Sequence, residues 1–181
     1  MYGTSWLVPW EGMTLTDQRS FKERAINAGV ARLGPPPGLN IVTTPDDLQV
    51  RPIRAFADFG VGTINEDEWQ FTLVAGLNAG AITVVARPAN QIVVFFGIDD
   101  HDTAPVATLV YFRTAPVGGT TKMLVDLQWC RGFTYCAGML SEPVVYDPQQ
   151  NIYVDIEAEA GHLEYIVFMG YVIEPRGQVV S

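Results

Sequence analysis

The stretch that most constrains the fold is the apolar run over residues 164–174, which ends before Pro175. In a strand, the two-residue period divides its side chains between two faces. The first face carries Tyr165, Val167, Met169, Tyr171 and Ile173, and the second carries Ile166, Phe168, Gly170 and Val172. Because both faces are apolar, we predict a strand at the centre of a sheet that is covered on both sides. The second cover comes either from this chain or from a neighbouring subunit.

From residue 52 onward, the sequence predicts many short strands separated by turn residues. The predicted strands cover residues 52–57, 69–75, 81–86, 91–98, 106–113, 122–129, 133–137, 143–146, 151–157 and 164–173. A short helix is the alternative for residues 121–130, because their apolar side chains recur every three to four positions; we favour a strand. Turn residues such as those at 78–80, Asn-Ala-Gly, lie between the apolar runs. In residues 151–157, apolar and polar side chains alternate, which predicts one buried face and one solvent-exposed face.

Many short strands without alternating helices predict an all-β fold, an antiparallel β-sandwich of the jelly-roll type. We expect an N-terminal arm and one short helix in addition to the sandwich. The predicted division places the arm, the helix and a proline-rich spacer in residues 1–51 and the β-sandwich body in residues 52–181.

The N-terminal arm contains Trp6 and Trp10 but has neither a helical nor a strand period. Exposing two such rings is unfavourable, so we expect the arm to lie in a groove of its own body or of another subunit. Next, the spacing of Ser20 and Glu23 predicts a capping box and a helix that runs to about residue 33. Residues 34–38, Gly-Pro-Pro-Pro-Gly, end it and form a semi-rigid spacer. Residues 44–47, Thr-Pro-Asp-Asp, form a second pattern that is typical of a helix start. Because Pro52 follows, any helix there is limited to about one turn.

Charge and hydropathy exclude several classes of partner. Residues 1–60 contain six basic and six acidic side chains, whereas residues 61–181 contain five and fourteen, so the net charge of −9 belongs to the body. An acidic body does not bind nucleic acid by counterion release. No stretch approaches the ~18 apolar residues of a membrane span, and the start has no secretion signal. We therefore expect neither nucleic acid nor membrane as a partner.

Few residues here have the chemistry of a metal or catalytic site. Residues 99–102, Asp-Asp-His-Asp, offer hard oxygen ligands in a loop, but their spacing does not match a helix–loop–helix calcium site. His162 and Glu164 form a second cluster, and a cupin-like enzyme would have to bring both histidines together with an acid. Cys130 and Cys136 lie in apolar surroundings, so we expect free, buried thiols. We predict no catalytic residue, no metal and no cofactor.

Aromatic side chains on the predicted strands suggest a carbohydrate-binding platform as an alternative function. The candidates for such a platform are Trp69, Trp129, Tyr111, Tyr135, Tyr146 and Tyr153. Aromatic residues in strands more often form the core or an interface. Carbohydrate binding therefore stays the second hypothesis, and a cupin-like metalloenzyme is a distant third.

The layout of the whole chain resembles the decoration, cement and minor structural proteins of tailed bacteriophages and related icosahedral virions. The shared features are an arm with tryptophans, a short helix, a proline spacer and an acidic many-stranded body that ends in a long apolar strand. The resemblance implies a non-enzymatic structural protein in the virion, made in the host cytoplasm. Its partners would be other virion proteins and further copies of itself, most simply in a trimer. The expected interface residues are Trp6, Trp10, Val167, Phe168, Met169 and Tyr171.

Overall fold

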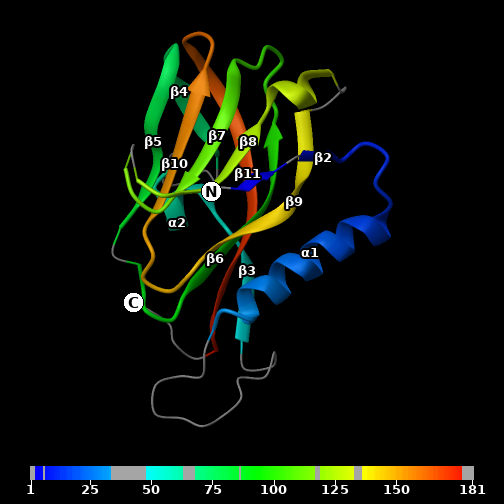
Figure 1. Ribbon diagram of the computed structural model, residues 1–181, viewed down its shortest axis with the longest axis vertical. Coiled ribbons are helices and arrows are strands. Elements are labelled where there is room, and N and C mark those ends of the chain that lie inside the picture. The colour runs from blue at the N-terminus through cyan, green and yellow to red at the C-terminus, as the bar shows by residue number, and fades with distance from the viewer. Residues whose placement is uncertain are drawn as a thin grey trace.

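The molecule is a sandwich of two mainly antiparallel sheets (Figure 1). A computed structural model describes residues 3–5, 7–33, 48–62, 68–85, 87–116, 119–132 and 136–176. The proline spacer at 34–38 and the helix-start signal at 44–47 lie outside the described residues. The predicted all-β sandwich is confirmed.

Eight strands form the body. They are β4 (Gln70–Leu73), β5 (Gly76–Val84), β6 (Ile92–Asp100), β7 (Ala107–Arg113), β8 (Thr121–Asp126), β9 (Cys136–Tyr146), β10 (Ile152–Ala158) and β11 (His162–Pro175). One sheet has the order β8-β7-β10-β5, and the other has the order β9-β6-β11 with β4 paired to β11. Numbered one to eight along the chain, the strands are ordered 5-4-7-2 and 6-3-8-1. Two interlocked sheets of this order form a jelly roll, as predicted.

Three further strands belong to the N-terminal part and extend these sheets. They are β1 (Gly3–Ser5), β2 (Leu7–Pro9) and β3 (Leu48–Pro52). β1 pairs in parallel with β8, and β2 pairs antiparallel with β9, so the arm joins one edge of both sheets. β3 pairs with the C-terminal part of β11 and spans the predicted boundary between residues 51 and 52. Whether residues 52–181 fold without the N-terminal part stays a prediction.

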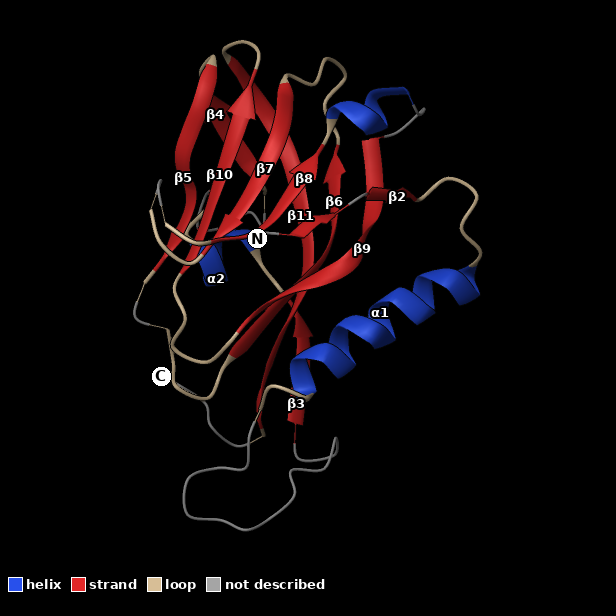
Figure 2. Ribbon diagram, in the orientation of Figure 1, coloured by secondary structure: helices blue, strands red, loops and turns tan. Residues whose placement is uncertain are grey.

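The long helix α1 (Leu15–Val30) lies across the outer face of the sheet that contains β11 (Figure 2). It begins at Thr14, whose side chain forms a capping box with Asp17, and not at Ser20 as predicted. The sequence contains two boxes of the same spacing, and the earlier one is used. At the other end, the Cα of Gly29 comes so close to the sheet that an added Cβ would lie 2.4 Å from Ile173 Cδ1. α1 therefore packs directly on the strands.

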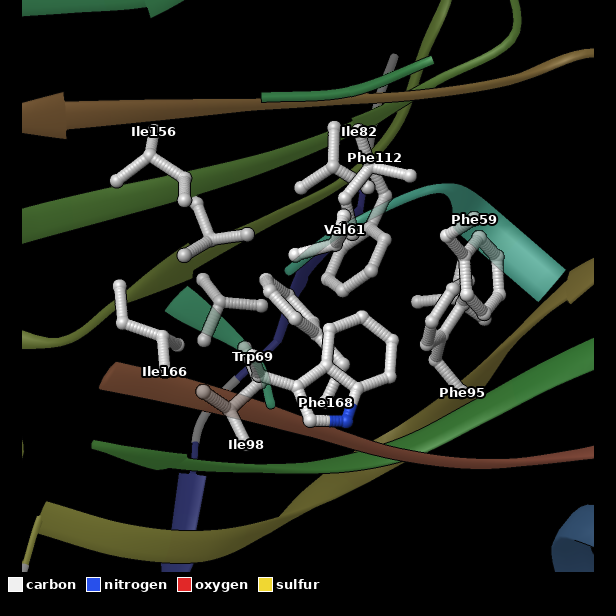
Figure 3. Packing of buried hydrophobic residues seen from close by; sticks show 14 of the residues in the cluster. Phe59, Val61, Trp69, Ile82, Phe95, Ile98, Phe112, Ile156, Ile166 and Phe168 are labelled. Carbon is white, nitrogen blue, oxygen red and sulfur yellow. The ribbon is translucent and has the colours of Figure 1, made fainter. Parts of the chain in front are cut away.

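Two hydrophobic clusters lie on the two faces of the β11 sheet. The first fills the space between the sheets, where Phe95 meets Phe112 and Phe168 with ring centroids 5.2 and 6.0 Å apart (Figure 3). The second lies under α1 and consists of Ala25, Leu48, Ile92, Val94, Phe96, Met139 and Ile173. The prediction that residues 164–173 form a central strand with two buried faces is thus confirmed. The second cover is α1 of the same chain.

Several strand predictions need correction. Residues 52–57 are not a strand: the short helix α2 (Ala55–Phe59) begins there, because Asp58 Oδ2 accepts the Arg54 backbone N–H and caps the turn. β9 is one strand where two were predicted. β8 confirms the strand predicted for residues 122–129. The last two residues of that predicted range belong instead to the 3-10 helix η2 (Gln128–Gly132).

The predicted turn at residues 78–80 lies inside β5. The pairing with β10 is irregular there, and Gly80 adopts φ +66°, a left-handed conformation that favours glycine. Asp155 Oδ1 accepts the Gly80 N–H at 2.7 Å, and Asp155 also pairs with Arg113 at 2.8 Å. Asp155 is therefore buried, whereas the alternation in 151–157 predicted a wet position.

Candidate functional site

The two clusters of acidic and histidine residues, distant in sequence, meet at one end of the sandwich. β6 and β11 run antiparallel, with Asp100 opposite Ile166, so the end of β6 lies beside the start of β11. His162 Nε2 lies 3.1 Å from Asp102 Oδ2. We call Asp100, Asp102, His162 and Glu164 the carboxyl cluster. Sequence reasoning singled out both segments but had no signal that they converge.

Glu164 joins the two sheets through its side chain. It is fully buried, and its carboxylate accepts the backbone N–H groups of Val106 and Ala107, at the start of β7, at 3.0–3.2 Å. β11 and β7 belong to different sheets, so the carboxylate acts as a polar link across the end of the sandwich. Hydrogen bonds to a charged acceptor are among the stronger ones.

Asp100 is 4% exposed and lies beside Glu164. Its Oδ1 accepts the Asp102 N–H at 3.2 Å, while its Oδ2 has no hydrogen-bond donor within the described part of the chain. Burial, and after it the neighbouring Glu164 carboxyl, raise the pKa of Asp100 to about 8. A proton shared between the two carboxyl groups satisfies the orphan oxygen and removes the repulsion. The arrangement can therefore hold and release a proton near neutral pH.

The two histidines do not form one site. His101 Nε2 lies 3.0 Å from Asp99 Oδ2, whereas His162 contacts Asp102. Over the described residues, no group of three or more Asp, Glu, His or Cys side chains has an arrangement that could hold a metal ion. The histidine and acid set that a cupin-like enzyme needs is thus not assembled among these residues.

The predicted aromatic platform is dispersed. Trp69 and Tyr146 are core residues, and Tyr135 lies outside the described residues. Tyr111 is on the outer face of the β7–β10 sheet, where its hydroxyl donates to Glu157 Oε2 at 2.9 Å. Tyr153 is a partly buried neighbour on β10. Trp129 is exposed on η2. Tyr111 and Tyr153 share a face, but the six candidates are not gathered into one platform among the described residues.

A cleft of about 540 Å³ lies between α2 and the edge strands β4 and β5. Its wall includes Phe59, Gln70, Thr72, Asn78 and Thr83. No sequence signal pointed to this cleft, because it forms between strands of opposite sheets.

The predicted interface residues of β11 divide between the two clusters. Phe168 lies in the core between the sheets, so it is not available on a surface of the folded chain. Met169, Tyr171 and Trp10 pack around the cluster under α1. Val167 is partly buried. The cover that was expected from a neighbour thus comes largely from this chain, and Trp6 lies outside the described residues.

The α1 cover does not reach the start of β11. Leu163 and Tyr165 are exposed on the outer face there, next to Thr72 and Gln70 of β4. Tyr165 Oη accepts a hydrogen bond from Gln70 Nε2 at 2.6 Å. Sequence reasoning placed Tyr165 on the same face as Val167 and Met169 without deciding which face is the outer one, and it did not identify Leu163 as exposed.

Cys136 forms a disulfide bond, so the expectation of free thiols is wrong. The 3-10 helix η2 packs against β9, which begins at Cys136. Spacing along the chain alone did not show this approach. In the described part of the chain, no helix has both the length and the apolar character needed to span a membrane.

Comparisons with known proteins identify no family for this chain. No family model and no curated protein matches the sequence. Among solved structures, the chain is similar to a chain in the VP2 subviral particle of infectious bursal disease virus, with 14% identity and a TM-score of 0.40. The similarity covers 80% of this chain and 37% of that chain. At this identity and TM-score, the similarity assigns no function.

Proposed function

We propose that this protein is a non-enzymatic structural subunit of a virus particle, which acts through contacts with copies of itself and with other virion proteins. The observation that carries the proposal is the jelly-roll order of the eight strands. Viral capsid domains, lectins and cupins use this architecture, so the step from fold to function is one of analogy. The side chains then distinguish among these three classes.

The lectin and cupin alternatives each require a site that the described residues do not form. A lectin platform needs aromatic rings on one surface, but Trp69 and Tyr146 stabilise the core. A cupin centre needs converging histidines, but His101 and His162 contact different aspartates. The structural class requires only apolar surface for subunit contacts.

Exposed apolar side chains supply such a surface. Leu163 is exposed on the outer face of the β11 sheet, Val74 is exposed in the β4–β5 turn, and Leu77 is exposed on β5 of the other sheet. Each of the three is more than 40% exposed. We propose these side chains as separate points of contact with other subunits. The virion location and the synthesis in the host cytoplasm remain parts of the proposal that rest on the resemblance of layout. The trimer that the same resemblance implies is a prediction that competes with the two-fold contact proposed below.

Fractionation of virus particles tests the proposal. Particles are purified by density gradient from an infected culture and analysed by quantitative mass spectrometry. We expect the chain to sediment with the particles at a fixed ratio to the major capsid protein. Finding the chain only in the soluble fraction would contradict the proposal, and binding on a glycan array would then favour the lectin alternative.

A further inference from the structure

We propose that the outer edge of β5 is a self-association surface, where β5 of a second copy adds antiparallel and joins two sheets across a two-fold axis. This inference rests on the proposed function, because it specifies one of the subunit contacts. It concerns a surface different from the predicted interface on β11.

Among the described strands, β5 is the long edge strand that has no partner on its outer side. It ends the order β1-β8-β7-β10-β5, and it is nine residues long. Figure 1 shows it at the margin of its sheet. The other edge of that sheet is already paired with β1. The edge strands on the opposite sheet, β3 and β4, have five and four residues. Long unpaired edges are templates for pairing with another chain.

The sequence of this edge lacks charged residues and proline, which commonly protect an edge against pairing. The bulge at Gly80 is a third protective device, and it leaves residues 82–84 as the regular stretch available for pairing. Residues 74–86 contain no Asp, Glu, Lys, Arg or Pro, although the chain has 31 charged residues. Edge strands that stay single normally carry a lysine or a proline. In addition, Val74, Leu77 and Val85 are 60%, 42% and 56% exposed. The edge therefore offers both main-chain groups and apolar contact area.

The edge is also held in a fixed conformation. The Asn78 side chain clamps the β4–β5 turn: its Oδ1 accepts the Val74 N–H at 2.8 Å, and its Nδ2 donates to the Val74 and Gly76 carbonyls. Asp155 fixes the irregular part at Gly80. Beyond it, residues 82–84 pair regularly with β10. A preorganised strand loses little conformational entropy on association, which favours binding.

The charge of the protein favours a second copy as the occupant. The chain has a net charge of −9, so two copies repel each other at most faces. An uncharged edge allows them to approach without facing like charges. It offers nothing to attract a basic partner, whereas antiparallel pairing of one strand with its own copy is self-complementary and closes at two subunits.

Analytical ultracentrifugation of the full chain and its variants tests the inference. Thr83 is exposed in the regular part of β5, so Thr83→Lys places two like charges across the proposed pair. We expect a wild-type dimer whose Kd rises on the order of tenfold or more in Thr83→Lys. Thr72→Lys on the edge strand β4 is the matched control and should leave the dimer unchanged. Val85→Lys provides a second variant if Thr83→Lys does not fold.

The outcomes separate this inference from the proposed function. A trimer, or a dimer that Thr83→Lys and Val85→Lys leave intact, overturns the β5 contact while subunit association stands. A wild-type monomer at the highest soluble concentration also overturns the β5 contact. The particle fractionation described above then decides the proposed function independently.

Discussion

The two edges of the sandwich are completed in different ways. At the β8–β9 edge, the arm adds β1 to one sheet and β2 to the other, so main-chain hydrogen bonds close both edges. At the β4–β5 edge, no described strand pairs with the outer side of β5, and a cleft separates the two sheets. The arm therefore completes its own subunit. Of the two grooves that the sequence allowed for the arm, its own body or another subunit, the described part of the arm uses its own body, and the β5 edge is the better candidate for contacts between subunits.

The outer faces of the two sheets differ in a similar way. On the β11 sheet, the outer side chains are mostly apolar, and α1 covers those of the cluster around Val94, Phe96 and Ile173 but not those at the start of β11. On the opposite sheet, outer side chains form polar pairs: Arg113 with Asp155, and Tyr111 with Glu157. These pairs lie in the surface of the sheet and need no protein cover. The difference explains why the single long helix packs on one face only.

Truncating one leucine at each edge should have the largest effect and the clearest contrast. Leu7 on β2 is 2% exposed, so Leu7→Ala leaves a cavity and should lower the free energy of unfolding by about 2–5 kcal/mol. Leu77 on β5 is the matched control. In protein dilute enough to be monomeric, Leu77→Ala should cost less than about 0.5 kcal/mol, because its side chain is exposed in the single chain. Urea unfolding measures both. Equal effects would remove the distinction between the edges.

The carboxyl cluster predicts how stability depends on pH. The pKa of Asp100 is raised from 3.8 to about 8, so the folded state keeps a proton that the unfolded state releases in this range. The free energy of unfolding should therefore fall as pH rises from about 4 to about 8, and the part of this fall between pH 5 and pH 8 is on the order of 4 kcal/mol. Asp100→Asn should abolish most of this slope. At the carboxyl cluster the Glu164 side chain joins the two sheets, whereas at the β8–β9 edge the main chain of the arm joins them.

Asp102→Asn is the control for this pH profile. Hydrogen bonding to Ala104 and contact with His162 lower the pKa of Asp102, so its contribution to stability is lost only at acidic pH. The variant should keep the slope between pH 5 and 8. Thermal or urea unfolding of the wild type, Asp100→Asn and Asp102→Asn between pH 5 and pH 8 measures the three slopes. A flat wild-type profile would show that the buried pair holds no proton.

Overpacking under α1 should have an intermediate effect. Gly29→Val pushes side-chain atoms into Ile173 and Val94, and we expect a loss of about 1–3 kcal/mol in the free energy of unfolding. Asn27→Val adds a branched side chain on the exposed side of the same helix and should change stability little, since the two residues have similar helix propensity. If both variants unfold at the same denaturant concentration, α1 does not cover the sheet closely.

The start of α1 should give the smallest effect. Thr14 Oγ1 accepts the Asp17 N–H at 3.2 Å, and Asp17 accepts the Thr14 N–H at 3.0 Å. Thr14→Ala should lower the free energy of unfolding by about 1 kcal/mol, whereas Thr14→Ser keeps the cap. Ser20→Ala should have almost no effect. If Ser20→Ala lowers the free energy of unfolding more than Thr14→Ala does, α1 begins at Ser20, as the sequence predicted.

Local patterns in the sequence predicted the β-sandwich and most strand positions. The alternation of Ile152, Val154 and Ile156 and the two apolar faces of residues 164–173 correspond to buried positions in the structure. These features depend on side-chain period, which a single sequence displays directly. The turn at 78–80 was misassigned because a glycine with a left-handed conformation serves a bulge as well as a turn.

Contacts between distant segments could not be predicted in the same way. The meeting of Asp100 with Glu164 depends on the register of β6 against β11, and the burial of Asp155 depends on Arg113 in the next strand. The closure of the edge by β2 depends on which strand of the body lies at that edge. Strand order determines all three, and strand order is not visible in one sequence. The candidate site was therefore found only as separate pieces.

Hydrogen exchange measured by mass spectrometry on the full chain, at low and high protein concentration, tests the difference between the edges most directly. Slow exchange is predicted for amides of β8 and β9 at both concentrations, because β1 and β2 of the same chain cover them. Amides of β5 should exchange faster at low concentration and become protected at high concentration. The opposite result would be fast exchange of the β8 and β9 amides in dilute protein, with slow exchange only at high protein concentration. That result would contradict the account, because it would mean that the arm pairs with a neighbouring subunit.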